Sequence, residues 1–132
     1  MQMLKEQNLI DDAITIGKLA ITKFKNDTTS HFLLGELYNS KKGFIKSLNH
    51  YSEASSIMKY NIFYQTILPN FTPVFGNDCQ MRIAEIYAKL NEIQLTCDAL
   101  FKAKDLLKLE TRPDKAQKEN ELQDKINQYC KD

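Results

Sequence analysis

Apolar residues between His31 and Met58 recur at the three- and four-residue spacing of two amphipathic helices. The marker positions are Leu34, Gly35 and Tyr38 in the first helix, and Tyr51 and Ala54 in the second. Small residues within an apolar stripe allow two helix backbones to approach closely, while large flanking residues fill the space around them. The pattern therefore predicts an antiparallel helical hairpin, with residues 28–61 as its unit.

The same residue types precede this hairpin at a constant shift, without a gap, so residues 1–27 form a truncated copy. Ala20 takes the position of Ala54, and the missing start of the copy leaves only a stub helix over Gln2–Gln7. We expect its second helix at Leu9–Lys25. The apolar stripe of that helix consists of Ile10, Ile14, Gly17, Ala20, Ile21 and Phe24.

A third copy, residues 77–110, follows after an insertion. Ala103 takes the position of Ala54, and Thr96 takes that of Ser47. The other matching positions are Ile83, Ala84, Tyr87, Ile93, Cys97, Leu100 and Leu107. A register held over three copies predicts stacked hairpins that share their stability.

The insertion, residues 62–76, differs in composition from the repeats. Pro69 and Pro73 prevent a continuous helix. Its aromatic residues are Phe63, Tyr64, Phe71 and Phe75. Two interpretations follow: the rings pack back onto the repeats, which is favoured because loop aromatics usually find cover, or they form an exposed patch that docks a partner.

After Pro113 the chain becomes highly polar, and residues 111–132 carry only a narrow apolar line. Its members are Ala116, Leu122, Ile126 and Tyr129. A helix from Asp114 to about Cys130 that covers the last repeat on one side and faces water on the other fits this pattern.

The hairpin pattern resembles the tetratricopeptide (TPR) repeat, a 34-residue helix–turn–helix unit. The resemblance implies an all-α fold, a TPR-like α-solenoid of antiparallel helix pairs with a C-terminal capping helix, in a single domain 1–132. Departures from the pattern are Gly17 at the site of Tyr51, Ala84 at the site of Gly35, and repeats that lack a terminal proline.

The order of stub, repeat, insertion and repeat also resembles the N-terminal region of TPR subunits of the anaphase-promoting complex, subunit seven especially. In those proteins the N-terminal repeats build scaffold and homodimer contacts within a ubiquitin ligase. The resemblance implies a role in the cell cycle and a homodimer through the N-terminal repeats.

Charge and cysteine content narrow the class of protein. Lys and Arg total 18 against 17 Asp and Glu, so no net field attracts nucleic acid or an anionic membrane. Charged residues interrupt the start of the chain, and no stretch is apolar enough to span a membrane, so we expect a soluble intracellular protein, cytoplasmic or nuclear. Three cysteines without CxxC spacing predict neither a disulfide framework nor a zinc site.

Few residues in the sequence are candidates for catalysis, phosphate binding or metal binding. The two histidines, His31 and His50, occupy repeat positions, and the sequence has neither a phosphate-binding glycine loop nor the ligand spacing of a metal site. We therefore expect no enzymatic activity, no cofactor and no metal.

The TPR resemblance implies a partner-binding groove along the first helix of each hairpin. It would be lined by Phe32, Glu36, Asn39, Met81, Glu85 and Ala88. Because this lining is acidic and apolar, a basic, hydrophobic segment is the expected guest. Two functions follow: a non-catalytic protein–protein interaction scaffold in a multiprotein assembly such as the anaphase-promoting complex, or a monomeric adaptor that binds such a peptide.

Overall fold

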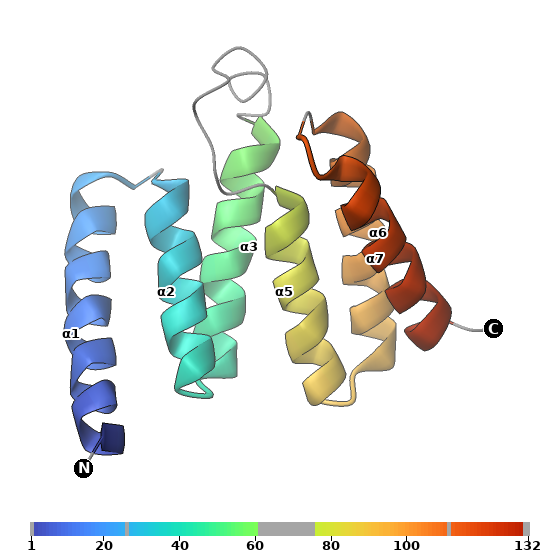
Figure 1. The fold of residues 1–132 in the computed structure, drawn as a ribbon. Coiled ribbons are helices and arrows are strands. Elements are labelled where there is room, and N and C mark those ends of the chain that lie inside the picture. The colour runs from blue at the N-terminus through green and yellow to red at the C-terminus, as the bar shows by residue number, and fades with distance from the viewer. Residues whose placement is uncertain (1, 26, 61–75, 111, 131–132) are drawn as a thin grey trace.

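The computed structural model describes residues 2–25, 27–60, 76–110 and 112–130 of the chain (Figure 1). The helices in these ranges are α1 (Gln2–Lys23), α2 (Thr28–Ser40), α3 (Phe44–Tyr60), α5 (Gly76–Lys89), α6 (Ile93–Leu109) and α7 (Lys115–Tyr129). The described ranges contain no β-strand. The predicted all-α class is therefore confirmed.

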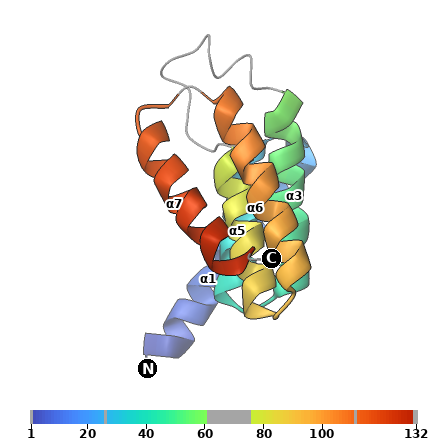
Figure 2. The same cartoon turned by 90° about the vertical axis from the view of Figure 1, so that its right-hand side faces the viewer.

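The helices follow one another in chain order and alternate in direction (Figure 1). Each helix packs on the next one in the sequence, and the closest partners are α2 with α3 and α5 with α6. Seen from the side, α5 and α7 form one layer, and α3 and α6 form the other (Figure 2). At the N-terminal end, α1 packs on α2.

The two central hairpins turn in the same way. The Gly43 amide donates to the Tyr38 carbonyl over 2.8 Å, and the Glu92 amide donates to the Tyr87 carbonyl over 2.9 Å. These bonds satisfy carbonyls that would otherwise be left free at the end of α2 and of α5. Because the tyrosines occupy matching positions, the register predicted for the two copies extends to their turns.

The predicted stub helix over Gln2–Gln7 is wrong, because α1 continues through it. In the other copies the chain reverses at a left-handed residue, Lys42 (φ 63°) or Asn91 (φ 60°). The matching residue, Asn8, lies inside α1. A reversed stub of two turns would bury little apolar area, whereas continuing α1 keeps its helical hydrogen bonds. The first copy therefore consists of a second helix alone.

The small residues expected between paired helices lie where α2 and α3 cross. The buried hydroxyl of Ser47 donates to the Gly35 carbonyl over 2.7 Å. A Cβ atom on Gly35 would lie 2.7 Å from the ring of Tyr51. In the next hairpin, the corresponding Ala84 and Thr96 are also buried, at 2% and 1% exposure. The small residues predicted at the crossing are buried in both hairpins, and the close approach itself is seen at Gly35.

Two apolar clusters hold the helices together. The larger joins α3, α5, α6 and α7, and its most buried members include Tyr51, Ile86, Leu100, Leu107 and Leu122. The smaller joins α1 to α2 through Ile14, Leu34 and Tyr38. Ala54 and Ala103, predicted from the register, are fully buried. Phe24 and Ile93, which belong to the same register, are instead exposed.

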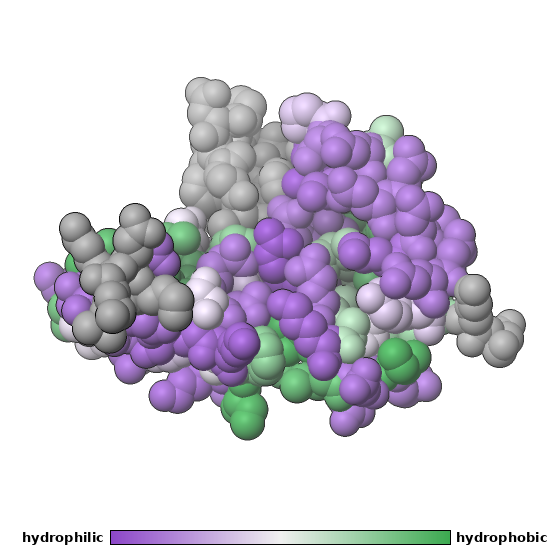
Figure 3. Space-filling model, turned by 60° about the horizontal axis from the view of Figure 1, so that its bottom comes forward, coloured by the Kyte–Doolittle hydropathy of each residue, from purple (hydrophilic) through white to green (hydrophobic). Residues whose placement is uncertain are grey.

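Helix α7 packs on α6 through a narrow apolar face. Leu122 and Ile126 are buried, and Tyr129 packs beside them. Ala116, however, is exposed, so its place in the predicted line is wrong. The apolar face begins only in the second half of α7, and the side of the molecule where α7 lies is almost entirely hydrophilic (Figure 3).

A disulfide bond joins Cys97 of α6 to Cys130 at the end of α7, with 5.6 Å between the Cα atoms. The cysteine spacing, which predicts no disulfide framework, therefore gave no sign of this single bond. Cys79 is a buried free thiol, and burial raises its pKa to about 12. Such a thiol stays protonated and unreactive near neutral pH.

Among the described helices, none has the combined length and hydropathy that crossing a membrane requires.

Candidate functional site

The predicted groove residues lie on one face each of α2 and α5. Their spacing of three and four residues places them in line along each helix. An ion pair connects the two helices, since Arg82 Nε of α5 lies 3.0 Å from Glu36 Oε1 of α2. The structure thus brings the two predicted halves of the groove next to each other.

Glu36 is engaged within the protein. Besides the Arg82 ion pair, its carboxylate accepts a hydrogen bond from the Tyr51 hydroxyl. Burial raises the pKa of Tyr51, and the hydrogen bond to Glu36 raises it further. The phenol therefore remains a donor at neutral pH, and the charge of Glu36 is compensated before any guest arrives. Glu36 thus links α2, α3 and α5, while its side chain stays 38% exposed on this face.

The other groove residues differ in accessibility. Met81 is 8% exposed and belongs to the core, so it contributes little to a surface. Phe32 is half-buried and meets the ring of Tyr51 edge-on, with 5.5 Å between centroids. Glu85 and Ala88 are partly exposed. The predicted groove is therefore interrupted at Met81, and its partly exposed residues lie on both α2 and α5.

Asn39 lies at the α2 end of this face. Its amide donates toward the Tyr51 hydroxyl oxygen and so partly opposes the rise in the Tyr51 pKa. Its Oδ1 atom is buried and has no hydrogen-bond partner among the described residues. An amide in this position adds polarity to the groove, but it joins no nucleophile or acid–base pair.

A hollow of about 320 Å³ continues the face between α5, α6 and α7. Its lining includes Glu85 and Ala88 from the predicted groove, together with Lys89, Lys125 and Tyr129. The sequence-based prediction missed Lys125 and Tyr129 as groove residues. Lys125 follows Leu122 by three residues and Tyr129 follows Ile126 by three, which shows which side of α7 they occupy but not that α7 lies beside α5.

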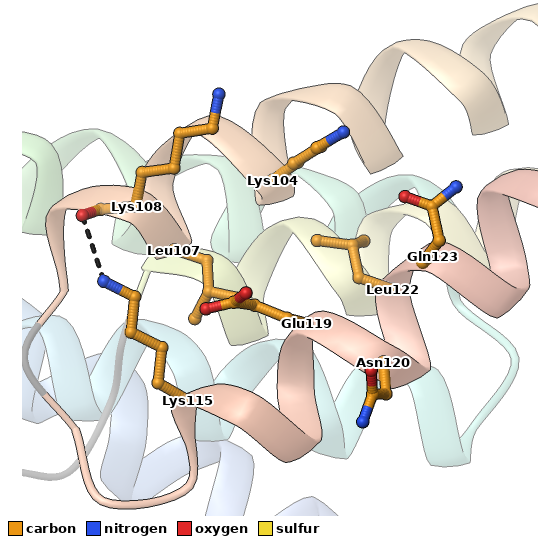
Figure 4. Close-up of a pocket in the computed structure, with 8 residues that line it drawn as sticks. All are labelled: Lys104, Leu107, Lys108, Lys115, Glu119, Asn120, Leu122 and Gln123. Carbon is orange, nitrogen blue, oxygen red and sulfur yellow. Dashed lines mark hydrogen bonds between the residues drawn. The ribbon is translucent and has the colours of Figure 1, made fainter.

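A second hollow of about 400 Å³ lies between α6 and α7, near Lys104, Lys108 and Lys115 (Figure 4). Lys115 Nζ donates to the Lys108 carbonyl over 3.1 Å. The ammonium group of Lys108 points away from Leu107 and Leu122, which form the apolar floor (Figure 4). These surface lysines do not converge on a point, so the hollow has no built anion site.

A buried polar cluster fixes the start of α5 to the loop between α6 and α7. The Asn77 amide donates to Glu110 Oε2 over 2.9 Å, and Arg112 lies 3.3 Å from Glu110 Oε1 and 3.1 Å from Asp78 Oδ2. Burial raises the pKa of Glu110 to about 7, while the Asn77 amide and Arg112 oppose the shift. The carboxylate satisfies the first turn of α5, so the cluster is structural.

The histidines form a pair between α2 and α3. Their Nδ1 atoms lie 3.2 Å apart, and His31 Nε2 lies 3.1 Å from the Lys25 carbonyl. Tyr38 stacks on His50, at 5.6 Å between centroids. No Ser or Cys nucleophile is among these contacts, and within the described residues no group of three or more His, Cys, Asp or Glu could hold a metal ion.

The predicted insertion patch of Phe63, Tyr64, Phe71 and Phe75 lies outside the described residues. Both interpretations of these rings stay predictions.

Comparison of the chain with models of protein families, with curated proteins and with solved structures finds no match in any of the three. The geometry of the site is that of an open, mixed-charge face on α2, α5 and α7, in which Glu36 and the Tyr51 phenol are already engaged with each other.

Proposed function

We propose that the chain is a non-catalytic protein–protein interaction scaffold whose hairpins pack as TPR repeats do, in a short α-solenoid. The observation that carries this proposal is the recurrence of one hairpin geometry. Helix pairs α2–α3 and α5–α6 share the tyrosine-bonded turn and the buried small residues at the helix crossing. Repeated hairpins build extended surfaces, and such surfaces suit polypeptide partners better than small molecules.

The accessible face on α5 and α7 supports a polypeptide partner. Glu85, Ala88 and Lys125 give it both signs of charge around an apolar surface. Mixed charge of this kind provides specificity in protein association. Since Glu36 is paired with Arg82, the face is less acidic than the adaptor alternative requires. The scaffold is therefore our first proposal, and a groove for a basic, hydrophobic peptide is the second.

An affinity pull-down from cells that express the chain tests the proposal. The groove variant Glu85→Lys/Ala88→Arg changes charge and shape on the accessible part of α5. The matched control Lys102→Glu changes an exposed residue on α6, in the other layer. We expect proteins recovered in stoichiometric amount by the wild type to be retained by Lys102→Glu and lost from the groove variant. Identical recovery by all three proteins would contradict the proposal.

Light scattering of the purified chain separates the two proposals. A scaffold predicts self-association or a stable complex with its recovered partner, whereas an adaptor predicts a monomer that binds a single basic peptide. Membership of an assembly such as the anaphase-promoting complex stays a prediction that the identity of the recovered proteins would test.

A further inference from the structure

Helix α1 is covered on only one of its two apolar faces. The face toward α2 carries Ile10, Ile14 and Ile21, which are partly or fully buried. A second face, the α1 stripe, consists of Leu9, Ala13, Ile16, Ala20 and Phe24. Leu9 is 61% exposed, Ile16 67% and Phe24 66%. The spacing of three and four residues aligns the stripe along the helix as a packing surface.

The register identifies what is missing from the α1 stripe. Ala13 and Ala20 correspond to Ser47 and Ala54 of α3, which are both fully buried. On α3 this face meets α2, since Ser47 donates to the Gly35 carbonyl. On α6 the matching face meets α5, since the Asn77 side chain donates to the Ala103 carbonyl. Because the first copy consists of α1 alone, no helix of the described chain occupies the corresponding position.

We propose that the α1 stripe is a docking surface for an amphipathic helix of a partner protein, which takes on α1 the place that α2 takes on α3. The proposal rests on the repeat packing of the proposed function and adds a second surface to it, distinct from the groove on α5 and α7. The same kind of helix–helix interface already occurs twice in the chain, between α2 and α3 and between α5 and α6.

The two existing hairpins define the chemistry of the partner helix. Each covering helix places a small residue at the crossing, Gly35 in α2 and Ala84 in α5, so the partner requires Gly or Ala in the middle of its apolar face. The exposed residues Asp12 and Lys23 flank the stripe on one side, three turns apart. An antiparallel partner therefore carries an acidic residue near its start, opposite Lys23, and basic residues near its end, opposite Asp12.

A second copy of this chain fits the stripe less well than such a helix. Two α1 helices packed antiparallel would bring Ile16 of one against the middle of the other, where the existing hairpins have a small residue. The branched side chain would hold the two backbones apart.

A synthetic peptide with the sequence of residues 27–42 is a suitable probe. It begins with Asp27, carries Gly35 at its centre and ends with Lys41 and Lys42. Fluorescence anisotropy of the labelled peptide, titrated with the full chain, should show saturable binding. Ile16→Lys should weaken this binding at least about tenfold, and a peptide with Gly35→Leu should weaken it similarly. Ile45→Lys, at a residue of α3 that is 77% exposed, is the matched control and should leave binding unchanged.

The folded state of each variant is checked by circular dichroism, and the substituted residues are exposed, so both variants should fold. Unchanged binding by Ile16→Lys would overturn the proposal, because the peptide would then be replacing α2 or binding elsewhere. A lack of saturable binding would also overturn it. A concentration-dependent dimer that Ile16→Lys abolishes, seen by sedimentation without peptide, would assign the stripe to a second copy. None of these results depends on the groove, which the Glu85→Lys/Ala88→Arg pull-down tests separately.

Discussion

At Gly35 the backbone of α2 meets the ring of Tyr51 so closely that a methyl group has no room. The added Cβ would lie 2.7 Å from ring carbons, and the ring itself is fully buried. We predict that Gly35→Ala lowers the free energy of unfolding by about 1–3 kcal/mol, despite the better helix propensity of alanine. Urea denaturation followed by circular dichroism measures this change.

Gly43→Ala provides the matched control for that substitution. Its Cβ would approach nothing closer than the Tyr38 carbonyl oxygen, at 3.5 Å, which is an ordinary contact. We expect a change within about 0.5 kcal/mol. Equal effects at the two glycines would show that backbone entropy, rather than the crossing of α2 and α3, explains the residue at Gly35.

Proton positions in the histidine pair follow from its contacts. Because His31 Nε2 faces the Lys25 carbonyl, it carries a hydrogen and donates it. In its neutral form, His31 Nδ1 is then an acceptor, and His50 Nδ1 must be the donor between the two rings. Protonating both rings would place hydrogens on both facing atoms, so the contact between α2 and α3 depends on at least one neutral histidine.

We predict that His50 makes the fold less stable in acid. Burial lowers the pKa of His50 below the ordinary 6.5, the charges of His31 and Lys18 lower it further, and Glu53 opposes them. As pH falls below the unfolded value, the unfolded chain binds the proton first, so stability is complete above that value and decreases beneath it. Urea denaturation from about pH 8 to about pH 5 should show a steeper loss in the wild type than in His50→Phe, which retains a ring against Tyr38. Parallel profiles would contradict the prediction.

At the scale of the helices, the helical spacing of residues in the sequence correctly predicts several of the side chains that are buried together. Ser47, Ala54 and Ala103 are buried as expected, because spacing along a helix fixes which side chains share a face. The same spacing could not show whether residues 2–7 form a separate stub helix. Whether the chain turns near Asn8 depends on what a reversed helix would bury, and that is a property of the tertiary structure.

For the candidate site, too, the sequence predicts the helix face that a residue occupies but not its contacts with other helices. Spacing places Glu36 and Glu85 on the outward faces of α2 and α5, but it does not reveal that Arg82 reaches across to Glu36. Nor does it show that α7 contributes Lys125 beside Glu85. Charge compensation depends on distances between helices, so the acidic character expected of the groove was overestimated.

The attachment of α7 to α6 also depends on such a distance. Cys97 and Cys130 are separated by 33 positions, and the packing of Leu122 and Ile126 in the larger cluster helps to bring them together. We predict that reduction, or Cys130→Ser, lowers the free energy of unfolding by about 3–4 kcal/mol on the loop-entropy model. Thermal melting with and without a reductant measures this. Cys79→Ala, which removes the remaining thiol, should leave the effect of the reductant intact.

At the scale of the whole molecule, stability is divided between two clusters of unequal size. Helices α3, α5, α6 and α7 share one continuous cluster that includes Leu100 and Leu122. Helix α1 is attached through the small cluster around Ile14 and Leu34. In repeat architectures each unit contacts only its neighbours, so the stability of one unit reaches another only through the interfaces between them. We therefore expect α1 to open at a lower free energy than α5 and α6.

Native-state hydrogen exchange on two core variants tests this division. Leu122→Ala leaves a cavity beneath α7 and should cost about 2–5 kcal/mol, which lowers amide protection across α5 and α6 while leaving α1 almost unchanged. Ile14→Ala should have the opposite effect: it should lower amide protection in α1 and leave the protection of α5 and α6 almost unchanged. If either substitution lowers protection equally in all helices, the molecule unfolds as one cooperative unit. In that case a helix bound at the α1 stripe would stabilise the whole array, whereas with two units its effect would be greatest on α1 and would weaken toward α7.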